Sequence, residues 1–215
     1  NTVLSVAGID AQRKGFGTDV LNRDNISWVL LRMAMEFDRR PEQYTDFEVT
    51  TWVSDYARMM STRNFTVGDA GGRIFGRVVT QWCMIDLTSR RPVDLTTPAV
   101  AATYGRYLVD APSPADAPRR ITGVAPQRER SHEVVYSDID FNRHVNTLRY
   151  LDMMLDMLPI ESFAGERAVR MDINFQRECR YGQTLTIGHE RRDACDLFEI
   201  SAEGSPAVRA ALEWR

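Results

Sequence analysis

Apolar and polar residues alternate one by one through most of the chain. In the first half the alternation covers residues 28–37, 47–53, 58–67 and 73–85, and in the second half residues 168–175, 184–190, 197–201 and 207–214. Successive side chains of a strand point to opposite faces, so a period of two predicts strands with one buried face. Glycine-containing turns at 68–72 and 203–206 join the last two strands of each half, which favours antiparallel pairing.

Apolar residues recur at helical spacing in two places, residues 2–13 and residues 145–158. Gly15 follows the first run and Pro159 follows the second, and both are typical of helix ends. Each half therefore predicts one helix followed by four strands. One more strand, residues 132–136, is predicted ahead of the second helix. The first half has no counterpart of it, so we expect that a first strand is missing and that Asn1 is not the natural N-terminus.

The two halves also share sequence. Residues 32–39 (RMAMEFDR) match residues 170–177 (RMDINFQR), and Gly72, Arg77 and Trp82 match Gly204, Arg209 and Trp214 at the same spacing. Two matches in the same order indicate a tandem duplication. The predicted fold is α+β, with two antiparallel sheets that each wrap around a central helix.

The predicted organisation is an N-terminal repeat over residues 1–109, a linker over residues 110–131 and a C-terminal repeat over residues 132–215. The linker contains four prolines and reads as an extended crossing segment. Its prolines are Pro112, Pro114, Pro118 and Pro126.

Composition restricts the class of protein. The 215 residues are 43% hydrophobic and carry a net charge of −3, which gives no sign of a nucleic-acid partner. No apolar run is long enough to span a membrane, and no signal peptide is visible. Cys83, Cys179 and Cys195 are far apart, so neither a metal site nor a disulfide framework is indicated and a reducing cytosol fits.

The segment of residues 140–146 (DFNRHVN) carries the strongest candidate chemistry. If it enters the helix as an extended segment, Asp140, Asn142 and His144 point the same way, toward the helix N-terminus. The free N–H groups and positive dipole end there favour an oxyanion, and Val145 and Asn146 are the candidate amide donors. A carboxylate, an amide, an imidazole and such donors are the parts of an acyl-transfer site.

Three other interpretations of this segment compete with that one. A calcium loop would use Asp138, Asp140 and Asn142, but Arg143 stands where the turn needs glycine and Arg149 where the bidentate glutamate belongs. Plain helix capping by Asn or Asp needs no chemistry. A buried histidine with satisfied hydrogen bonds is the third alternative.

The chain resembles the acyl-ACP (acyl carrier protein) thioesterases, double-hotdog enzymes of plant plastids and bacteria, and most resembles the bacterial type. The resemblance runs through nearly the whole chain. Its markers are residues 51–53, Arg58 with residues 61–65, residues 82–86 with 90–92, residues 140–146 and residues 177–179. Thr147 departs from the family, which usually has a second Asn there, and the missing first strand is a larger departure.

This resemblance implies a tandem double hotdog fold and hydrolysis of fatty acyl-ACP to free fatty acid and ACP. It implies no metal and no organic cofactor. Carried over position by position, the catalytic set is Asp140, Asn142, His144 and Glu178. A cysteine-based form of the mechanism would also enlist Cys179.

We assign Asp140 as the base or nucleophile, with Asn142 and His144 holding it and the water. Glu178, expected on a neighbouring strand, is a candidate for orienting water or sharing the base role, and its alternative is a surface charge paired to Arg177 or Arg180. A carboxylate beside Cys179 would raise the pKa of the thiol, so we favour Cys179 as a structural or site-lining residue.

The first repeat lacks the polar set and is free to bind the acyl tail. The candidates for its lining are Trp28, Met33, Met35, Met59 and Met60, with ordinary core packing as the alternative for each. Acyl carrier protein is acidic, and the basic clusters available to it are Arg90-Arg91, Arg119-Arg120 and Arg128 with Arg130.

Two functions of other classes remain open. A hotdog hydratase or dehydratase would act on enoyl or hydroxyacyl thioesters, and a non-catalytic module would bind acyl-ACP without turnover. We expect a cytoplasmic bacterial protein, and a homodimer is left open.

Overall fold

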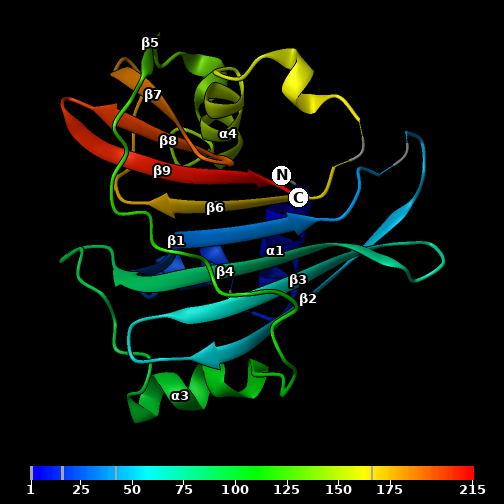
Figure 1. Ribbon diagram of the computed structural model, residues 1–215. Coiled ribbons are helices and arrows are strands. Elements are labelled where there is room, and N and C mark those ends of the chain that lie inside the picture. Colours follow the sequence, from blue (N-terminus) through cyan, green and yellow to red (C-terminus); the bar gives the residue numbers. More distant parts are fainter. Residues whose placement is uncertain (1, 16, 42, 166) are drawn as a thin grey trace. The chain divides into compact units, whose positions relative to one another are not determined.

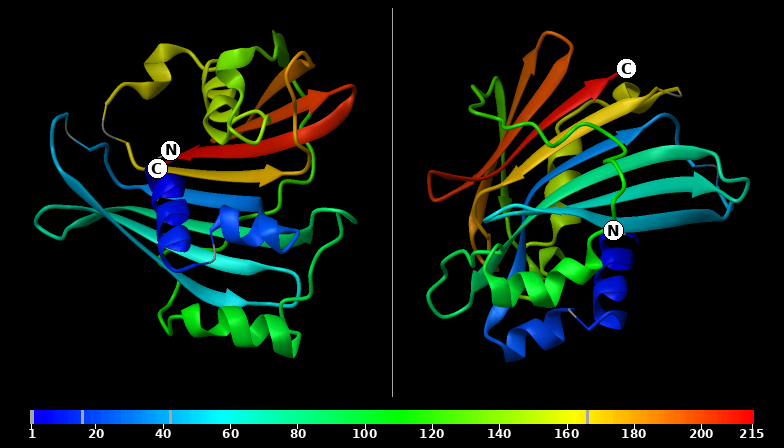
Figure 2. Two further views of the ribbon diagram at one scale, coloured as in Figure 1. Left: turned by 180° about the vertical axis from the view of Figure 1, so that it is seen from behind. Right: turned by 90° about the horizontal axis from the view of Figure 1, so that it is seen from below.

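The computed structural model describes residues 2–15, 17–41, 43–165 and 167–215 (Figures 1 and 2). The chain divides into two compact units, the first ending at Pro118 and the second beginning at Arg119. Each unit is an antiparallel sheet with helices. Among the described residues, no helix is both long and apolar enough to cross a membrane.

Unit 1 contains one four-stranded sheet in the order β2-β3-β4-β1. Its strands are β1 (Ile26–Phe37), β2 (Phe47–Tyr56), β3 (Ser61–Asp69) and β4 (Ile74–Asp86). Its helices are α1 (Thr2–Arg13), α2 (Thr18–Arg23), α3 (Pro98–Tyr104) and the 3₁₀ helix η1 (Gly105–Tyr107). Helix α1 lies across one face of this sheet (Figure 2, left), where its buried Ala7 and Ala11 permit close packing.

Unit 2 contains a five-stranded sheet in the order β6-β9-β8-β7-β5. Its strands are β5 (Arg128–Glu133), β6 (Val169–Phe175), β7 (Thr184–Arg192), β8 (Cys195–Ala202) and β9 (Ser205–Trp214). Its helices are the 3₁₀ helix η2 (Tyr136–Asp138), α4 (Thr147–Leu155) and the 3₁₀ helix η3 (Ile160–Phe163). Helix α4 packs against the sheet, with contacts to β7.

Both predicted helices and the eight strands predicted after them are present, and most of their ends lie within about two residues of the prediction. The strand predicted at residues 132–136 is misplaced, because β5 spans Arg128–Glu133. This edge strand is exposed at every residue but His132, so no buried alternation marks it in the sequence. It pairs with β7 from Arg128 opposite His189 to Glu133 opposite Thr184.

The register of the strands preserves the duplication. Glu36 of β1 pairs with Arg77 of β4, and Asn174 of β6 pairs with Arg209 of β9, so equivalent residues of the two repeats are partners. The equivalence of the paired residues ends at Arg32 of β1, because the pairing of β1 with β4 shifts between Leu30 and Arg32. The pairing of β6 with β9 has no such shift. A bulge adds one residue to a strand and shifts the pairing of the residues beyond it. The repeats thus share one scaffold with a local difference in β1.

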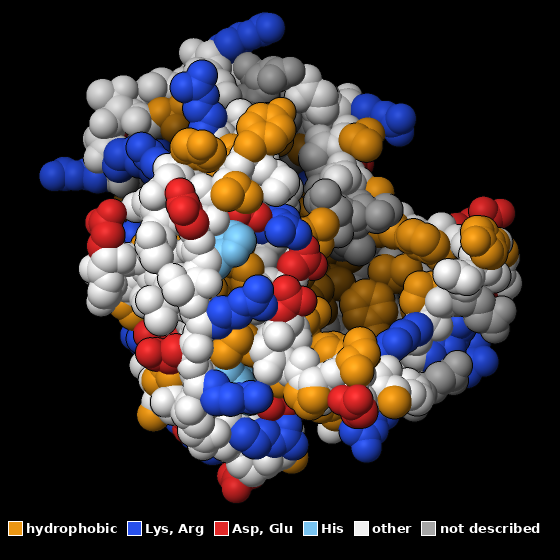
Figure 3. Space-filling model, turned by 90° about the horizontal axis from the view of Figure 1, so that it is seen from above, with side chains coloured by type: hydrophobic (Ala, Val, Ile, Leu, Met, Phe, Trp, Pro, Cys, Tyr) orange, Lys and Arg blue, Asp and Glu red, His pale blue; other side chains and the backbone are white. Residues whose placement is uncertain are grey.

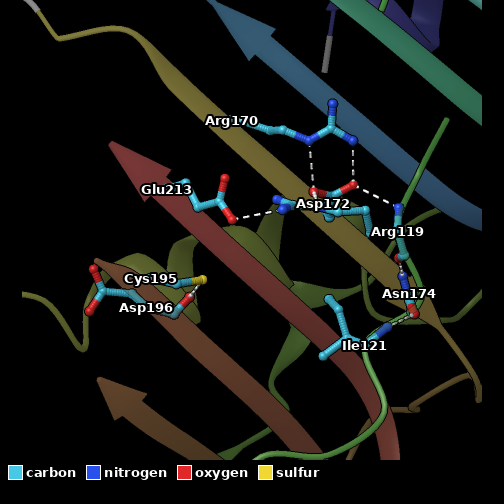
Figure 4. Close-up of polar contacts among 8 residues, drawn as sticks. All are labelled: Arg119, Ile121, Arg170, Asp172, Asn174, Cys195, Asp196 and Glu213. Atoms are coloured by element: carbon cyan, nitrogen blue, oxygen red, sulfur yellow. Dashed lines mark hydrogen bonds and ion pairs between the residues drawn. The ribbon is translucent and has the colours of Figure 1, made fainter. Parts of the chain in front are cut away.

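The linker is fastened to unit 2 by buried polar side chains (Figure 4). Asp172 is fully buried and accepts hydrogen bonds from N and Nε of Arg119 at 2.8 and 2.7 Å, and also from Arg170. Asn174 accepts from Ile121 N at 2.8 Å and donates to Arg119 O at 2.9 Å. Burial opposes ionisation of Asp172, but the guanidinium bonds outweigh it and hold the pKa of this carboxyl below its ordinary value. These bonds fix the path of the chain into β5.

Candidate functional site

The segment that holds the candidate chemistry is a tight turn in the chain leading into α4. Asp140 N donates to His144 O at 2.8 Å, and Arg143 N donates to Asp140 O at 3.0 Å. Arg143 has a φ of 64°, the left-handed conformation that a close turn requires. The expectation of an extended entry segment was therefore wrong. Its residues come together because the backbone reverses, not because alternate side chains share a face.

The Asp140 carboxylate shapes this turn. Its Oδ1 accepts hydrogen bonds from the backbone N–H groups of Asn142 at 2.8 Å and His144 at 3.2 Å. Aspartate commonly organises turns in this way. No hydrogen bond to Oδ2 of Asp140 is found among the described residues, and this second oxygen can meet a water or substrate. Asn142 lies at the exposed tip of the turn.

His144 is brought to Glu178 by the backbone. His144 forms an antiparallel bridge with Arg180, and Val145 N donates to Cys179 O at 2.8 Å. As a result Nε2 of His144 lies 3.3 Å from Oε2 of Glu178. Both side chains remain partly open, at 26% and 32% exposure, so water can reach the pair.

Glu178 does not lie on a strand, contrary to the prediction. It follows the end of β6 at Phe175, in a segment without regular structure. The ion pair with Arg180, which was the alternative interpretation of Glu178, exists at 4.0 Å and is longer than the contact with His144. Glu178 therefore combines a surface charge contact with a contact inside the candidate site.

The amides predicted to meet an oxyanion are already hydrogen-bonded. Val145 N donates to Cys179 O and Asn146 N donates to Asp138 O, both at 2.8 Å. Asn146 caps α4 instead, since its Oδ1 accepts from Leu148 N at 3.0 Å. The oxyanion role predicted for Val145 and Asn146 is thus wrong. Thr147 N, the first amide of α4, has no hydrogen-bond partner within the described parts of the chain.

A buried carboxylate anchors the turn, a role that sequence reasoning missed. Asp138 is fully buried and lies 2.7 Å from His132 Nε2, and it accepts from Val135 N at 2.9 Å and Arg149 Nε at 2.9 Å. Burial opposes ionisation, but these three bonds outweigh it and hold the pKa of Asp138 below its ordinary value. Asp138 thereby ties β5, the turn and α4 together. In the sequence it stood out only as a weak candidate for a calcium ligand.

Cys179 is buried beneath the site. Its side chain has no exposure, and its N–H donates to the Tyr150 hydroxyl at 3.2 Å. Burial raises the pKa of the Cys179 thiol, which lowers its thiolate fraction. The expected direction is confirmed, but the cause is burial and not the neighbouring Glu178.

Unit 1 holds an apolar hollow between α1 and its sheet, with a volume of about 150 Å³. Trp28 and Trp82 line it, together with small residues of α1 such as Ala7 and Ala11. The candidates Met33 and Met35 are not part of this lining. Met33 is 3% exposed, as expected for core packing, and Met59 is exposed. Among the predicted tail-binding residues, only Trp28 therefore borders the hollow.

The polar end of this hollow is formed by Arg63, which is 7% exposed. Arg63 pairs with Asp10 of α1 and donates from Nε to Thr51 Oγ1 at 3.0 Å. Burial raises the pKa of neighbouring Tyr56 to about 12, so its hydroxyl stays protonated. The hollow thus combines apolar walls with one arginine, Arg63, whose charge is balanced by Asp10.

The basic clusters proposed for a carrier protein are exposed, but their guanidinium groups differ in availability. Arg119 is bound to Asp172 and Glu213, whereas Arg130 only approaches Asp156 at 4.0 Å. Figure 3 shows basic (Lys or Arg) and acidic side chains beside exposed hydrophobic ones on the face seen from above. Within the described residues, no group of three or more His, Cys, Asp or Glu side chains is placed to hold a metal ion.

Comparison with known proteins gives a consistent result. A family model described as the acyl-ACP thioesterase N-terminal domain matches residues 1–104, and one described as the C-terminal domain matches residues 123–215. The chain is similar to the crystal structure of an acyl-ACP thioesterase from Bacteroides thetaiotaomicron, with 34% identity, a TM-score of 0.88, and 100% and 87% of the two chains covered.

Similarity extends to plant proteins. An acyl-[acyl-carrier-protein] hydrolase of Cuphea viscosissima is 26% identical, over 80% of this chain and 43% of the plant protein. The chain spans about half the length of the curated relatives it matches. A MaoC-like dehydratase from Phytophthora capsici shares the fold alone, with 12% identity and a TM-score of 0.57 over 87% of this chain and 72% of the other.

Proposed function

Because the chain belongs to the acyl-ACP thioesterase family, we propose that it hydrolyses fatty acyl-ACP thioesters to free fatty acid and ACP. The observation that carries this proposal is the water-accessible pair of His144 and Glu178 beside the carboxylate of Asp140. Hydrolysis needs a base or nucleophile, a positioned water and a donor for the oxyanion. These three residues supply the first two requirements.

In the proposed reaction, Oδ2 of Asp140 removes a proton from water or attacks the thioester carbon itself. The new bond is carbon to oxygen, the bond that breaks is carbon to sulfur, and the sulfur leaves as a thiolate. A thiolate is a good leaving group at neutral pH, so no strong acid is needed. If Asp140 attacks first, water then hydrolyses the resulting anhydride and restores the carboxylate.

Glu178 and His144 are proposed to position the water. When Nε2 of His144 carries its proton toward Glu178, Nδ1 is left as an acceptor for a water proton. Asn142, at the tip of the turn, is proposed to donate its amide N–H to the water or the substrate carbonyl. Thr147 N at the start of α4 replaces Val145 and Asn146 as the proposed oxyanion donor, supported by its open hydrogen-bonding capacity and the helix dipole.

The repeats are proposed to divide the work. Unit 1 offers the apolar hollow bordered by Trp28 for an acyl tail, while the polar set of Asp140, Asn142, His144 and Glu178 lies in unit 2. The protein partner is proposed to be an acidic acyl carrier protein that meets exposed arginines such as Arg90 and Arg130. Three cysteines without disulfides and a bacterial structural neighbour support a bacterial, cytoplasmic setting for this reaction.

A hydratase or dehydratase is the second candidate, favoured by the shared fold of the dehydratase neighbour. The two reactions give different products from different substrates. We would incubate the protein with a series of acyl-ACPs and enoyl-ACPs and identify the products by mass. Free fatty acid from saturated acyl-ACP supports hydrolysis, and hydroxyacyl-ACP from enoyl-ACP supports the alternative. If the protein binds acyl-ACP but forms neither product, it is a non-catalytic carrier-binding module.

A further inference from the structure

A second hollow lies in unit 2, at the C-terminal side of α4, whereas His144 precedes the helix. Its volume is about 310 Å³, and its charged lining consists of Arg128, Arg167, Arg191 and Asp196 around His189. Arg128 Nη2 donates to Met157 O at 3.1 Å, just beyond the end of α4. None of these residues belongs to the proposed hydrolytic set.

The charge of this hollow is unbalanced. Among the described residues of the lining, three guanidinium groups face one carboxylate, that of Asp196. Both oxygens of Asp196 are already used, since Oδ1 lies 2.9 Å from His189 Nε2 and Oδ2 pairs with Arg191. Arg167 has no hydrogen bond or ion pair within the described residues. Two positive charges therefore have no matching carboxylate among the described residues of the lining.

The floor of the hollow is organised by buried groups. The side chains of His189 and Asp196 are each 5% exposed. The His189 ring packs on the Phe198 ring, with the ring centroids 5.1 Å apart. Arg128 Nη2 lies 3.3 Å from His189 Nδ1. A guanidinium can only donate, so Nδ1 accepts and the His189 proton lies on Nε2, directed at Asp196. The imidazole thus links Arg128 to Asp196.

We propose that this hollow binds a phosphate group. Guanidinium groups match phosphate oxygens in a forked geometry, and two unmatched positive charges suit a phosphate monoester or diester. Arg128 and Arg191 are held in place by protein partners before any ligand arrives, which lowers the entropic cost of binding. The Ser162 hydroxyl adds a donor, and Leu158, Pro159 and Trp214 form an apolar wall for the group that carries the phosphate.

Two sources could supply this phosphate. One is the phosphodiester that joins the prosthetic arm to an acyl carrier protein, and this source rests on the proposed function. The other is a free phosphorylated small molecule that binds apart from catalysis. Binding of phosphate itself does not depend on hydrolysis, so the site and the proposed function can fail separately.

The first test measures binding without turnover. Inorganic phosphate would be titrated at constant ionic strength, with chloride as the reference, and followed by thermal unfolding and calorimetry. We expect a saturable rise in Tm, and an affinity at least tenfold weaker in Arg167→Gln, which removes a guanidinium without breaking a described contact. Arg73→Gln, at an exposed turn of unit 1, is the matched control and should bind as the wild type does. Equal binding by Arg167→Gln and wild type, or no saturable effect of phosphate, would overturn the proposal.

The second test identifies the source. We would compare KM for acyl-ACP with KM for the same acyl group on N-acetylcysteamine, a thioester without phosphate. If the carrier phosphodiester is the ligand, Arg167→Gln raises KM several-fold for acyl-ACP only. If a free phosphate ester is the ligand, both KM values stay unchanged while phosphate binding is lost. A rise of both KM values together would contradict a phosphate site and indicate a general disturbance.

Discussion

His144 Nε2 and Glu178 Oε2 approach to 3.3 Å although the two residues come from different segments, one before α4 and one after β6. The contact depends on the backbone bridge of His144 with Arg180 and on the bond from Val145 N to Cys179 O. A backbone clamp of this kind fixes the imidazole and the carboxylate without needing either side chain to be buried. Substitutions at the clamped site should therefore alter the chemistry while the clamp itself persists.

Removal of the His144 imidazole should lower kcat/KM far more than removal of the Cys179 thiol. We expect His144→Ala to lose at least about 100-fold in kcat/KM, the lower range for an acid–base group. Cys179→Ala should stay within about tenfold of the wild type, because the thiol is fully buried and burial raises its pKa. Steady-state hydrolysis of acyl-ACP measures both. Inactive Cys179→Ala together with an acyl adduct on Cys179 of the wild type would reverse the assignment.

Asp140→Asn should abolish hydrolysis and leave the fold intact. An asparagine Oδ1 can still accept from Asn142 N and His144 N, so the turn is retained while the negative charge is lost. Circular dichroism and Tm report on the fold, and kcat/KM reports on the chemistry. If the variant keeps more than about a tenth of the activity, less than about 1.4 kcal/mol of transition-state stabilisation is lost, and Asp140 is neither base nor nucleophile.

Helices α1 and α4 and most strands could be predicted because each buries one face, and burial imposes its period on the sequence. Helices α2 and α3, of six and seven residues, are too short to show such a period and were not predicted. β5 was misplaced because the exposed edge strand carries no such period. The candidate site was only partly predictable, because contacts between distant segments leave no periodic pattern in the sequence. Asp140 and His144 are near neighbours in the sequence, but contacts such as that of His144 with Glu178 depend on tertiary pairing. The backbone N–H groups of Val145 and Asn146 are likewise occupied by hydrogen bonds to Cys179 O and Asp138 O, which the periodicity of the sequence does not predict.

Asp138→Asn should destabilise the protein in a pH-dependent way. The folded pKa of Asp138 is lowered, so the unfolded chain binds the proton more readily and stability rises with pH between the two values. The stabilisation is complete above about pH 4, the ordinary value of an unfolded aspartate, and is lost as the pH falls through the folded pKa. We expect a loss of about 1–3 kcal/mol near neutral pH from the broken bonds to His132 and Arg149.

Urea unfolding of wild type and Asp138→Asn near pH 7 and below pH 4 would measure this effect. The difference in free energy of unfolding should shrink at the acidic pH. Asp152→Asn is the matched control, because Asp152 also pairs with Arg149 at 2.8 Å but is 53% exposed. An exposed pair contributes at most about 1 kcal/mol. The same energy difference at both pH values would show that the charge of Asp138 is not what stabilises the turn.

Trp28→Ala should change which chain length is cleaved more than how fast the best substrate is cleaved. Trp28 borders the apolar hollow of unit 1 and stacks on Tyr56 with ring centroids 6.5 Å apart, so its removal lengthens the space open to an acyl tail. Each buried methylene is worth about 0.8 kcal/mol, so two more carbons in an enlarged hollow favour the longer substrate roughly tenfold. Met33→Leu is the control, because Met33 is buried outside the lining and the exchange nearly conserves volume. The measurement is kcat/KM across a series of acyl-ACPs of increasing length. A profile that keeps its shape in Trp28→Ala and changes only in height would show that the tail does not lie against this residue.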